Sequence, residues 1–538
     1  MAAAVPRAPS RRLTLVACIL GTAMVFLDGT IVNVALPALQ RDLGAGLSAQ
    51  QWVVEAYMLT LSSLLLVGGS LDDLFERRTV FAAGVAGFGV TSLACAVAPS
   101  IGFLIAARAL QGVAGAMLVP STLAIIMAVF PPTERAGAIG SWTAWAGIAT
   151  VIGPLGGGVL IEAASWRWIF VLNVPFVVVT LYLTARAMPR MRSAQEHARV
   201  DWLGGLLCGL GLGGVIVALI EQPRLGWADP LVAASGVGGV VVLALFVLHE
   251  RRARAPMMPL DLFRSRNFAI GNVATLTLYA GLSGTLFFVA LFLQQVAGYS
   301  PVAAGAAFLP FTILMFLLSR RLGALADRVG PRLFMGLGPI VAGAGLLLLL
   351  RVGTDPSFVG DILPAIVVFG LGMSATVAPL TATVLGAVGE HRSGVASGVN
   401  NAISRVAGLL AIAVLGAVVA GAFSHAVDDD LGGRPLSPAA RAAVGEAKDR
   451  SLATAPADRL RGAERARVKA TLADASVSAV HLGLGLGGLL VIAGGIVSLA
   501  GIENPRRNVP SRECPGGALV GASEDHAHPA PARELAAA

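Results

Sequence analysis

The sequence predicts an all-α protein that crosses a membrane many times. Of its 538 residues, 56% are hydrophobic and only 13% are charged, which is about half the charged share of a soluble globular domain. The mean hydropathy is +0.78. A soluble chain of this length would form several domains, and each would need many more surface charges. These observations exclude a soluble multidomain enzyme, a disordered chain and a secreted disulfide scaffold.

Fourteen apolar runs are long enough to cross the bilayer core, which takes about 20 mostly apolar residues. They cover residues 13–36, 52–71, 79–98, 101–124, 136–160, 168–188, 202–221, 230–249, 269–293, 303–322, 333–351, 361–387, 395–421 and 477–501. The runs at 202–221 and 230–249 are the weakest, because they are rich in glycine and only a short polar stretch separates them. None shows the alternation of a membrane β-strand, so we expect no barrel.

The first run resembles a signal peptide in being preceded by Arg7, Arg11 and Arg12. It is longer than a typical signal core, however, and it carries Asp28 and Asn33. We therefore interpret it as a spanning helix. The four cysteines show no paired spacing, so we expect neither a disulfide framework nor a metal site.

The distribution of basic residues predicts the orientation, because cytoplasmic loops carry an excess of arginine and lysine. If the N-terminus is cytoplasmic, most of the 39 basic residues lie in inward segments, and the short outward loops hold only Arg41, Arg167, Arg224 and Arg351. We expect a multi-pass protein of the plasma (inner) membrane with both termini cytoplasmic. The net charge of +8 is then a topology signal and an attraction for anionic lipid, not a nucleic-acid footprint.

Two predicted inward loops repeat each other at a constant offset. They read Gly69-Ser-Leu-Asp-Asp73-Leu-Phe-Glu76-Arg77-Arg78 and Gly323-Ala-Leu-Ala-Asp327-Arg328-Val-Gly330-Pro-Arg332. Internal repeats are typical of secondary transporters. The repeat and the predicted spans divide the chain into a six-helix bundle (13–190), two extra peripheral helices (202–249) and a second six-helix bundle (269–501). These are flanked by a cytoplasmic N-terminus (1–12) and a disordered cytoplasmic tail (502–538). The second bundle includes a long outward segment, 422–476.

Both loops resemble the G-x-L-a-D-r-x-G-r-r signature of the major facilitator superfamily, although Glu76 replaces a turn glycine and puts the first turn in doubt. Other segments resemble the drug:proton antiporter branch with fourteen spans, the EmrB/QacA type. They are Leu27-Asp28-Gly-Thr30-Ile-Val-Asn33-Val-Ala-Leu-Pro37, Arg108-Ala-Leu-Gln111-Gly112, Gly153-Pro154-Leu-Gly-Gly157-Gly158, Trp166-Arg-Trp-Ile-Phe-Val-Leu-Asn173-Val-Pro175 and Gly298-Tyr-Ser-Pro301. The resemblance runs from about residue 13 to 501. It implies two pseudo-symmetric bundles of a major facilitator fold, arranged as six, two and six helices.

The energy source is expected to be a proton gradient, with no cofactor. The sequence has no phosphate-cradling G-x-x-x-x-G-K-[ST] loop, and its two lysines, Lys448 and Lys469, lie in the outward segment. A proton carrier needs a titratable group inside the membrane. Asp28 and Glu55 are the clear acidic residues within spans, and the histidines lie in loops, tails or span ends.

Asp28 and Arg108 should lie at a similar depth on helices that run in opposite directions, at about 1.5 Å of rise per residue. Because a lone charge in the membrane is costly, we infer a direct pair or a water-linked contact. Movement of the arginine would let the carboxylate take a proton, so proton and substrate would compete for this acidic site. The family resemblance implies the same roles for Asp28 and Arg108. Two structural alternatives stay open: Asp28 bonded to Thr30 or Asn33, and Arg108 as a pin for the bundle.

Glu55 lies near the predicted outer end of its span, where it could snorkel to the interface, bind a proton or bind a cation. Arg405, in the thirteenth span, is expected to be structural or an inner gate contact, with a direct transport role as the alternative.

The glycine-rich fifth span predicts a tight seam between the bundles, formed by Gly153, Pro154, Gly157 and Gly158. Ordinary small-residue packing is the alternative. The repeated loops are predicted gates at the inner face, and solvated charge is the alternative for their arginines. The predicted gating residues of these loops are Gly69, Asp73, Arg77, Arg78, Gly323, Asp327 and Arg328.

The sequence predicts a transporter, not an enzyme, that exports drugs or other amphipathic small molecules in exchange for protons by alternating access. One alternative is a dedicated exporter or importer of one metabolite or antibiotic. A membrane-embedded enzyme is a distant alternative, since no convergent His, Asp or Cys cluster is visible at one membrane face. We expect a monomer. Segment 422–476 is either a solvated linker or a contact site for an accessory export protein. The generic apolar spans do not identify the substrate.

Overall fold

The described chain is built from helices and the loops between them. A computed structural model describes residues 10–189, 201–253, 256–354, 356–388, 393–431, 436–450, 460 and 462–504. Some helical side chains within these ranges, including those of Asp73 and Asp327, lie outside the described part. Most of the predicted tail, 502–538, also lies outside it. The chain up to Ile502 forms one unit.

The first bundle contains the predicted first six spans. Its helices are α1 (Arg11–Leu43), α2 (Leu47–Leu74), α3 (Arg77–Ala96), α4 (Ile101–Val129), α5 (Pro132–Ala163), α6 (Trp168–Val171) and α7 (Asn173–Ala187). The sixth predicted span is interrupted at Leu172, which separates α6 from α7. Within the bundle α2 packs on α4, α1 packs on α5, and α3 packs on α4.

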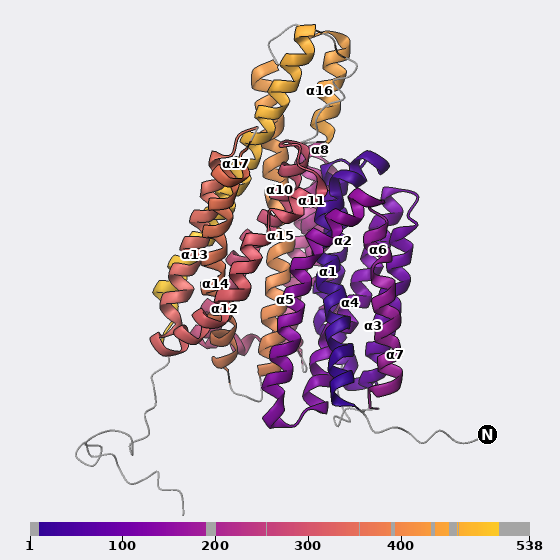
Figure 1. Cartoon of the computed structure of the whole chain (residues 1–538), viewed down its shortest axis with the longest axis vertical. Helices are drawn as coiled ribbons and strands as arrows, with labels where there is room; N and C mark the ends of the chain where they lie inside the picture. The colour runs from indigo at the N-terminus through magenta and orange to yellow at the C-terminus, as the bar shows by residue number, and fades with distance from the viewer. Residues whose placement is uncertain are drawn as a thin grey trace, which may run out of the picture. The chain divides into compact units, whose positions relative to one another are not determined.

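The second bundle repeats this packing. Its helices are α10 (Arg266–Gln295), α11 (Pro301–Ala306), α12 (Leu309–Val329), α13 (Pro331–Leu348), α14 (Leu363–Gly386), α15 (Ser393–Leu431) and α17 (Gly462–Gly501). Short turns precede or continue them: η1 (Leu260–Arg264), η2 (Leu349–Arg351) and η3 (Phe358–Ile362). Here α12 packs on α14, α10 on α15, and α13 on α14. The equivalent helices of the two bundles thus make equivalent contacts, as the repeated loops predicted. In Figure 1 the first bundle runs from indigo to purple and the second from rose to yellow.

The two inserted helices, α8 (Trp202–Leu225) and α9 (Pro230–Arg252), differ in their surroundings. α9 packs mainly against α8, whereas α8 contacts both α2 of the first bundle and α15 of the second. A Cβ atom on Gly205 would lie 2.5 Å from Val67 of α2, so only glycine allows this approach. α8 therefore lies against both bundles and α9 mainly against α8, and the peripheral position of the two helices stays a prediction.

The predicted number of spans is largely reproduced. Twelve helical segments in the described chain are long and apolar enough to cross a membrane. α2 and α5 are not among them, although they have 28 and 32 residues and pack inside the first bundle. The chain is a multi-pass helical membrane protein, and the count of fourteen spans stays a prediction.

In the described part of segment 422–476, which is predicted to face outward, the helices continue from the spans. α15 extends to Leu431 and α17 begins at Gly462, and α16 (Pro438–Arg450) contacts both of them at the top of the view in Figure 1. The apolar pattern ended at 421 and 477, but the Ala-rich sequence beyond it favours helix and carries the helices further. Leu431, Val444 and Leu472 are buried among these helices, and they belong to the hydrophobic core that continues into the bundles.

Two faces are named from α1. The face at which α1 begins is the N-terminal face, and the face at which it ends, with Leu43, is the distal face. Among the described residues, we find three hydrogen bonds that join the two bundles, and these three lie toward the distal face. Gln51 donates to the Ile412 carbonyl oxygen at 2.9 Å, Gln294 donates to the Val34 carbonyl at 3.2 Å, and Gln295 donates to Gln40 at 2.8 Å. The bundles are therefore closed against each other on the distal side.

Candidate functional site

A buried ion pair lies at the centre of the first bundle. Arg108 of α4 donates from Nη1 to the Asp28 carboxylate of α1, and the two side chains are 1% and 0% exposed. The predicted pair is thus present as a direct contact. Helix depth alone placed the two residues at one level, and the cost of an isolated charge in an apolar interior explains why they meet.

Other polar side chains complete the coordination of Asp28. Gln111 donates from Nε2 to the Asp28 carboxylate at 3.0 Å, and Asn173 donates from Nδ2 to it at 3.2 Å. Both amides also bond to the Ser92 hydroxyl, at 2.8 and 3.2 Å. Asp28 therefore accepts from three residues on two other helices, α4 and α7. The Thr30 hydroxyl donates to the carbonyl oxygens of Phe26 and Leu27 of its own helix, at 3.2 and 3.1 Å.

Arg108 is held from several sides. Its Nε donates to the Val53 carbonyl oxygen at 3.1 Å, and its Nη1 also donates to Gln111 at 2.8 Å. The guanidinium carbon lies 4.2 Å from the ring centroid of Tyr57, a favourable cation–π distance. Arg108 thus links α4 to α1 and to two positions on α2. It is both the partner of Asp28 and a pin between helices.

Sequence reasoning named Asp28 and Arg108 but missed Gln111, Asn173 and Ser92 as members of this cluster. Gln111 and Asn173 both lie in segments that carry the family resemblance, so a signal was available. A neutral amide in an apolar run does not require a partner as strongly as a charge does, so its presence alone does not predict a contact with Asp28. Ser92 carries no such signal.

Glu55 lies apart from this cluster, one turn after Gln51 in α2. It is fully buried, and neither carboxylate oxygen has a hydrogen-bond partner among the described residues. A snorkelling side chain would reach water, so that alternative is excluded. Gln51 bonds across to α15, which places Glu55 close to the contact between the two bundles.

The glycines of the fifth span lie at two contacts. Cβ atoms at Gly153 and Gly157 would lie 2.4 Å from Thr30 Oγ1 and 2.3 Å from Ile31 Cγ1, so these glycines let α5 approach α1 within the first bundle. A Cβ atom at Gly158 would lie 2.5 Å from the Pro301 carbonyl oxygen of α11, in the second bundle.

The approach of α5 and α11 is reciprocal. A Cβ atom on Gly305 of α11 would lie 2.4 Å from the Pro154 carbonyl oxygen. The predicted seam between the bundles is therefore formed by Pro154 and Gly158, whereas Gly153 and Gly157 serve the packing of one bundle.

A cavity lies between the bundles beside this seam. About 450 Å³ of its space is free of atoms, part of it open to the outside. Its lining comes from α1, α5, α10, α12 and the turn that precedes α12: Thr30, Asn33, Val34, Pro154, Leu286, Ala290, Phe308, Phe311 and Thr312. The polar side chains of the lining are those of Thr30, Asn33 and Thr312, and the others are aliphatic or aromatic. A mostly apolar lining with a few polar groups is typical of sites for amphipathic small molecules, and in this conformation about 40 Å³ of the cavity is open to a water-sized molecule.

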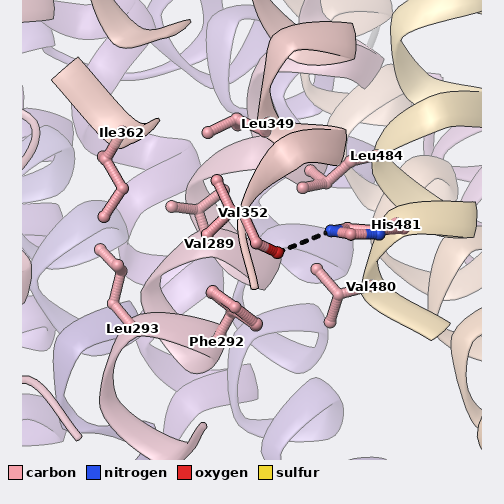
Figure 2. Close-up of a pocket in the computed structure, with 9 residues that line it drawn as sticks. All are labelled: Val289, Phe292, Leu293, Leu349, Val352, Ile362, Val480, His481 and Leu484. Atoms are coloured by element: carbon pink, nitrogen blue, oxygen red, sulfur yellow. Dashed lines mark hydrogen bonds between the residues drawn. The ribbon is translucent and has the colours of Figure 1, made fainter. Parts of the chain in front are cut away.

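A second cavity lies inside the second bundle and is almost wholly apolar. Figure 2 shows its lining, in which His481 of α17 points toward the Val352 carbonyl oxygen, with 2.9 Å between Nε2 and that oxygen. The other lining residues are aliphatic side chains and Phe292. Because the imidazole already has a partner and the cavity does not lie between the bundles, we assign it to helix packing.

The first of the repeated loops is more firmly anchored than solvated charges would be. Arg77 donates to the Ala124 carbonyl oxygen at 3.3 Å, and Arg78 donates to the carbonyl oxygens of Met188 and Ala185 at 3.2 and 3.1 Å. These carbonyls lie at the C-terminal ends of α4 and α7, where a positive charge is favourable. The arginines therefore tie α3 to the ends of its neighbours.

The two loops turn differently. Gly330 of the second loop has φ = 106°, a conformation that favours glycine, whereas Glu76 of the first has φ = −63°. The doubt about a tight first turn is therefore confirmed.

The predicted loop glycines make only moderate contacts. A Cβ atom on Gly323 would lie 3.2 Å from Ala378, and one on Gly69 would lie 3.5 Å from Pro120. The close approach belongs instead to Gly68, where a Cβ atom would lie 2.0 Å from the Ala116 carbonyl oxygen. Arg328 is exposed. The side chains of Asp73 and Asp327 lie outside the described residues, so their predicted gating role stays a prediction.

Sequence comparison identifies the family. The profile of the Major Facilitator Superfamily matches residues 18–412. The chain belongs to the major facilitator superfamily. Members of this superfamily are transporters, which agrees with the expectation of a non-enzyme.

Characterised relatives within the superfamily are named for drug resistance. The multidrug resistance protein Stp of Mycobacterium tuberculosis (strain H37Rv) is 36% identical over 78% of each chain. The puromycin resistance protein pur8 of Streptomyces alboniger is 38% identical, over 77% of this chain and 83% of its own length. The tetracenomycin C resistance and export protein of Streptomyces glaucescens is 33% identical over 93% of both chains.

Solved structures show the same fold. A bacterial homologue of the human lysosomal transporter Spinster, in an inward-facing and occupied conformation, gives a TM-score of 0.65 over 92% of this chain and 99% of that one, at 16% identity. The peptide transporter POT in complex with sulfate gives 0.59, over 90% and 94%, at 13% identity. The major facilitator fold predicted from the repeated loops is thereby confirmed.

Proposed function

We propose that this superfamily member exports amphipathic small molecules, including antibiotics, in exchange for protons. The observation that carries the proton coupling is the Asp28–Arg108 pair, a titratable group buried in the first bundle in contact with its countercharge. Separation of the arginine from the carboxylate would favour protonation of Asp28, because an ionised carboxylate without a partner is costly in an apolar interior. Proton binding and the position of α4 are then linked.

The closed distal seam supports alternating access around the cavity between the bundles. If the N-terminal face is cytoplasmic, as the arginine distribution predicts, this conformation is inward-facing. Opening would require α5 to leave α11 and α2 to leave α15. Arg108 bonds to the backbone of α2, so a change at Asp28 has a direct route to one of these contacts.

The names of the relatives support drug export as the direction and the substrate class. Relatives are named for resistance to puromycin and for resistance to and export of tetracenomycin C. A dedicated exporter of one antibiotic remains the second candidate, since three such relatives each carry one compound in their name.

The test is efflux from everted vesicles under an imposed pH gradient, with puromycin and tetracenomycin C as compounds. Wild type should release protons when a compound is added. Asp28→Asn should lose gradient-driven efflux at normal expression. The matched control is Asp42→Asn, a carboxylate of the same helix that bonds to Trp166, and it should behave as wild type. Full gradient-driven efflux by Asp28→Asn would refute the coupling role.

A further inference from the structure

One intramembrane charge has no part in the proposed proton chemistry. Arg405 lies within α15, half-buried, and its guanidinium carbon is 5.5 Å from the ring centroid of Phe26 in α1. Phe26 belongs to the first bundle and Arg405 to the second, so this contact crosses between them. Tyr279 of α10 packs against the cluster of Ala280, Ala407 and Ala411, and the last two of these lie on α15 close to Arg405 in the sequence.

Arg405 lies beside the cavity between the bundles. Phe26 precedes the cavity residue Thr30 by about one helical turn, and Tyr279 precedes the cavity residue Leu286 by about two turns. The side of the cavity away from the distal seam is therefore flanked by a guanidinium and aromatic rings.

No carboxylate neutralises Arg405 among the described residues, in contrast to Arg108. An arginine inside a membrane protein normally faces the bundle interior and pairs with an anion or with water. The guanidinium of Arg405 thus has donors available for an anion that enters from the N-terminal side.

The two intramembrane acids are not available to a ligand in this conformation. Asp28 is fully buried and accepts bonds from Arg108, Gln111 and Asn173. Glu55 is fully buried away from the cavity lining. The charge presented along the path to the cavity is therefore positive.

We propose that Arg405 binds the acidic group of the transported compound, and that the substrate class is an aromatic organic anion. The planar guanidinium takes a carboxylate, sulfonate or ionised phenol through paired donors, and it also stacks on aromatic rings as it does on Phe26. The apolar body of the compound occupies the cavity against Phe308 and Phe311. This inference rests on the proposed export function and names the substrate class of that site.

Three probes that share one ring system test the charge preference. Dansylate is an anion, dansylamide is neutral and dansylcadaverine is a cation, and binding of each to the purified full chain in lipid nanodiscs is followed by dansyl fluorescence. Wild type should bind dansylate most tightly. Arg405→Gln should weaken dansylate binding about tenfold, as expected for loss of a hydrogen bond to a charged group, and leave dansylamide unchanged. Arg351→Gln, an exposed arginine of the same bundle, is the matched control.

Unchanged dansylate binding by Arg405→Gln, or a preference of wild type for dansylcadaverine, would overturn the assignment. If the glutamine variant unfolds, Arg405→Lys decides the question, because lysine keeps the charge but lacks the planar fork. Weaker dansylate binding with unchanged dansylamide binding supports the assignment. Unchanged binding of both probes contradicts it.

Transport in proteoliposomes separates this inference from the proposed function. Arg405-dependent binding of dansylate without any pH-driven transport would leave the site standing and refute proton-coupled export. Transport of dansylcadaverine driven by the pH gradient, with no effect of Arg405→Gln, would leave export standing and refute the anion site.

Discussion

Arg108 of α4 donates a hydrogen bond to the carboxylate of Asp28 of α1 at a position where both side chains are excluded from water. The pair joins two helices of one bundle, and Arg108 extends the link to α2 through the Val53 carbonyl oxygen. A buried pair of this kind contributes little net stability while intact, but the loss of one partner leaves an uncompensated charge. That asymmetry gives the pair a measurable signature.

Arg108→Gln should be strongly destabilising, by about 3 to 5 kcal/mol, because Asp28 is left buried without its countercharge. The double variant Asp28→Asn with Arg108→Gln should recover part of this loss, since two neutral amides can bond to each other. Unfolding in detergent of wild type, of each single variant and of the double variant gives the free energies that are compared. Strictly additive effects of the two substitutions would contradict a direct interaction.

Asn173→Ala should slow transport and lower stability by about 1 to 3 kcal/mol, because it removes a donor from the Asp28 carboxylate and from Ser92. Vesicle efflux and detergent unfolding give the two values. The control is Thr381→Ala, an exposed hydroxyl that bonds only within its own helix in the contacts described. Equal behaviour of the two variants would show that Asn173 is not part of the functional cluster.

Gly158→Val should open the distal seam, because a side chain there meets the Pro301 carbonyl oxygen. The readout is labelling of Asn33→Cys, in the cavity, by a membrane-impermeant maleimide applied from the distal side, with the native cysteines replaced. Labelling should increase. Gly156→Val is the matched control, since the contact that a Cβ atom there would make is with Ile152 of its own helix, at an ordinary distance of 3.9 Å. Unchanged labelling in the Gly158 variant would place the closure elsewhere.

Glu55→Gln should fold normally and favour the closed distal seam. The carboxyl group is buried without a hydrogen-bond partner among the described residues, so a neutral side chain costs less there than an ionised one. Distal labelling of Asn33→Cys should fall below that of the parent protein. Glu134→Gln, in an exposed position, should leave labelling unchanged. Increased labelling in the Glu55 variant would exclude a neutral Glu55 in the closed state.

Much of the architecture could be predicted because it depends on local chemistry. A crossing needs about 20 apolar residues, so the spans follow from hydropathy, and the repeated loops predicted two equivalent bundles. The helices continue beyond the apolar runs, however, at Leu431 and from Gly462. Hydropathy could not show this, because helix formation outside the membrane depends on propensity and on packing with α16.

The candidate site was predictable only in its charged members. Asp28 and Arg108 were paired from depth alone, since each charge needs a partner at its own level. Gln111 and Asn173 were not predicted, because an amide finds its partner through the rotation of each helix about its axis, which a span prediction leaves free.

The sequence by itself determined that this protein is a multi-pass helical transporter with a repeated bundle and one buried acid–base pair. These conclusions rest on the cost of exposing polar groups and isolated charges to lipid, which acts on each segment separately. Only the tertiary structure decided that Gly158, not Gly153, meets the second bundle, that Gly68 is the close contact of the first loop, and that the seam is closed on the distal side. Those facts depend on how whole helices rotate and pack against one another, and no single segment encodes them.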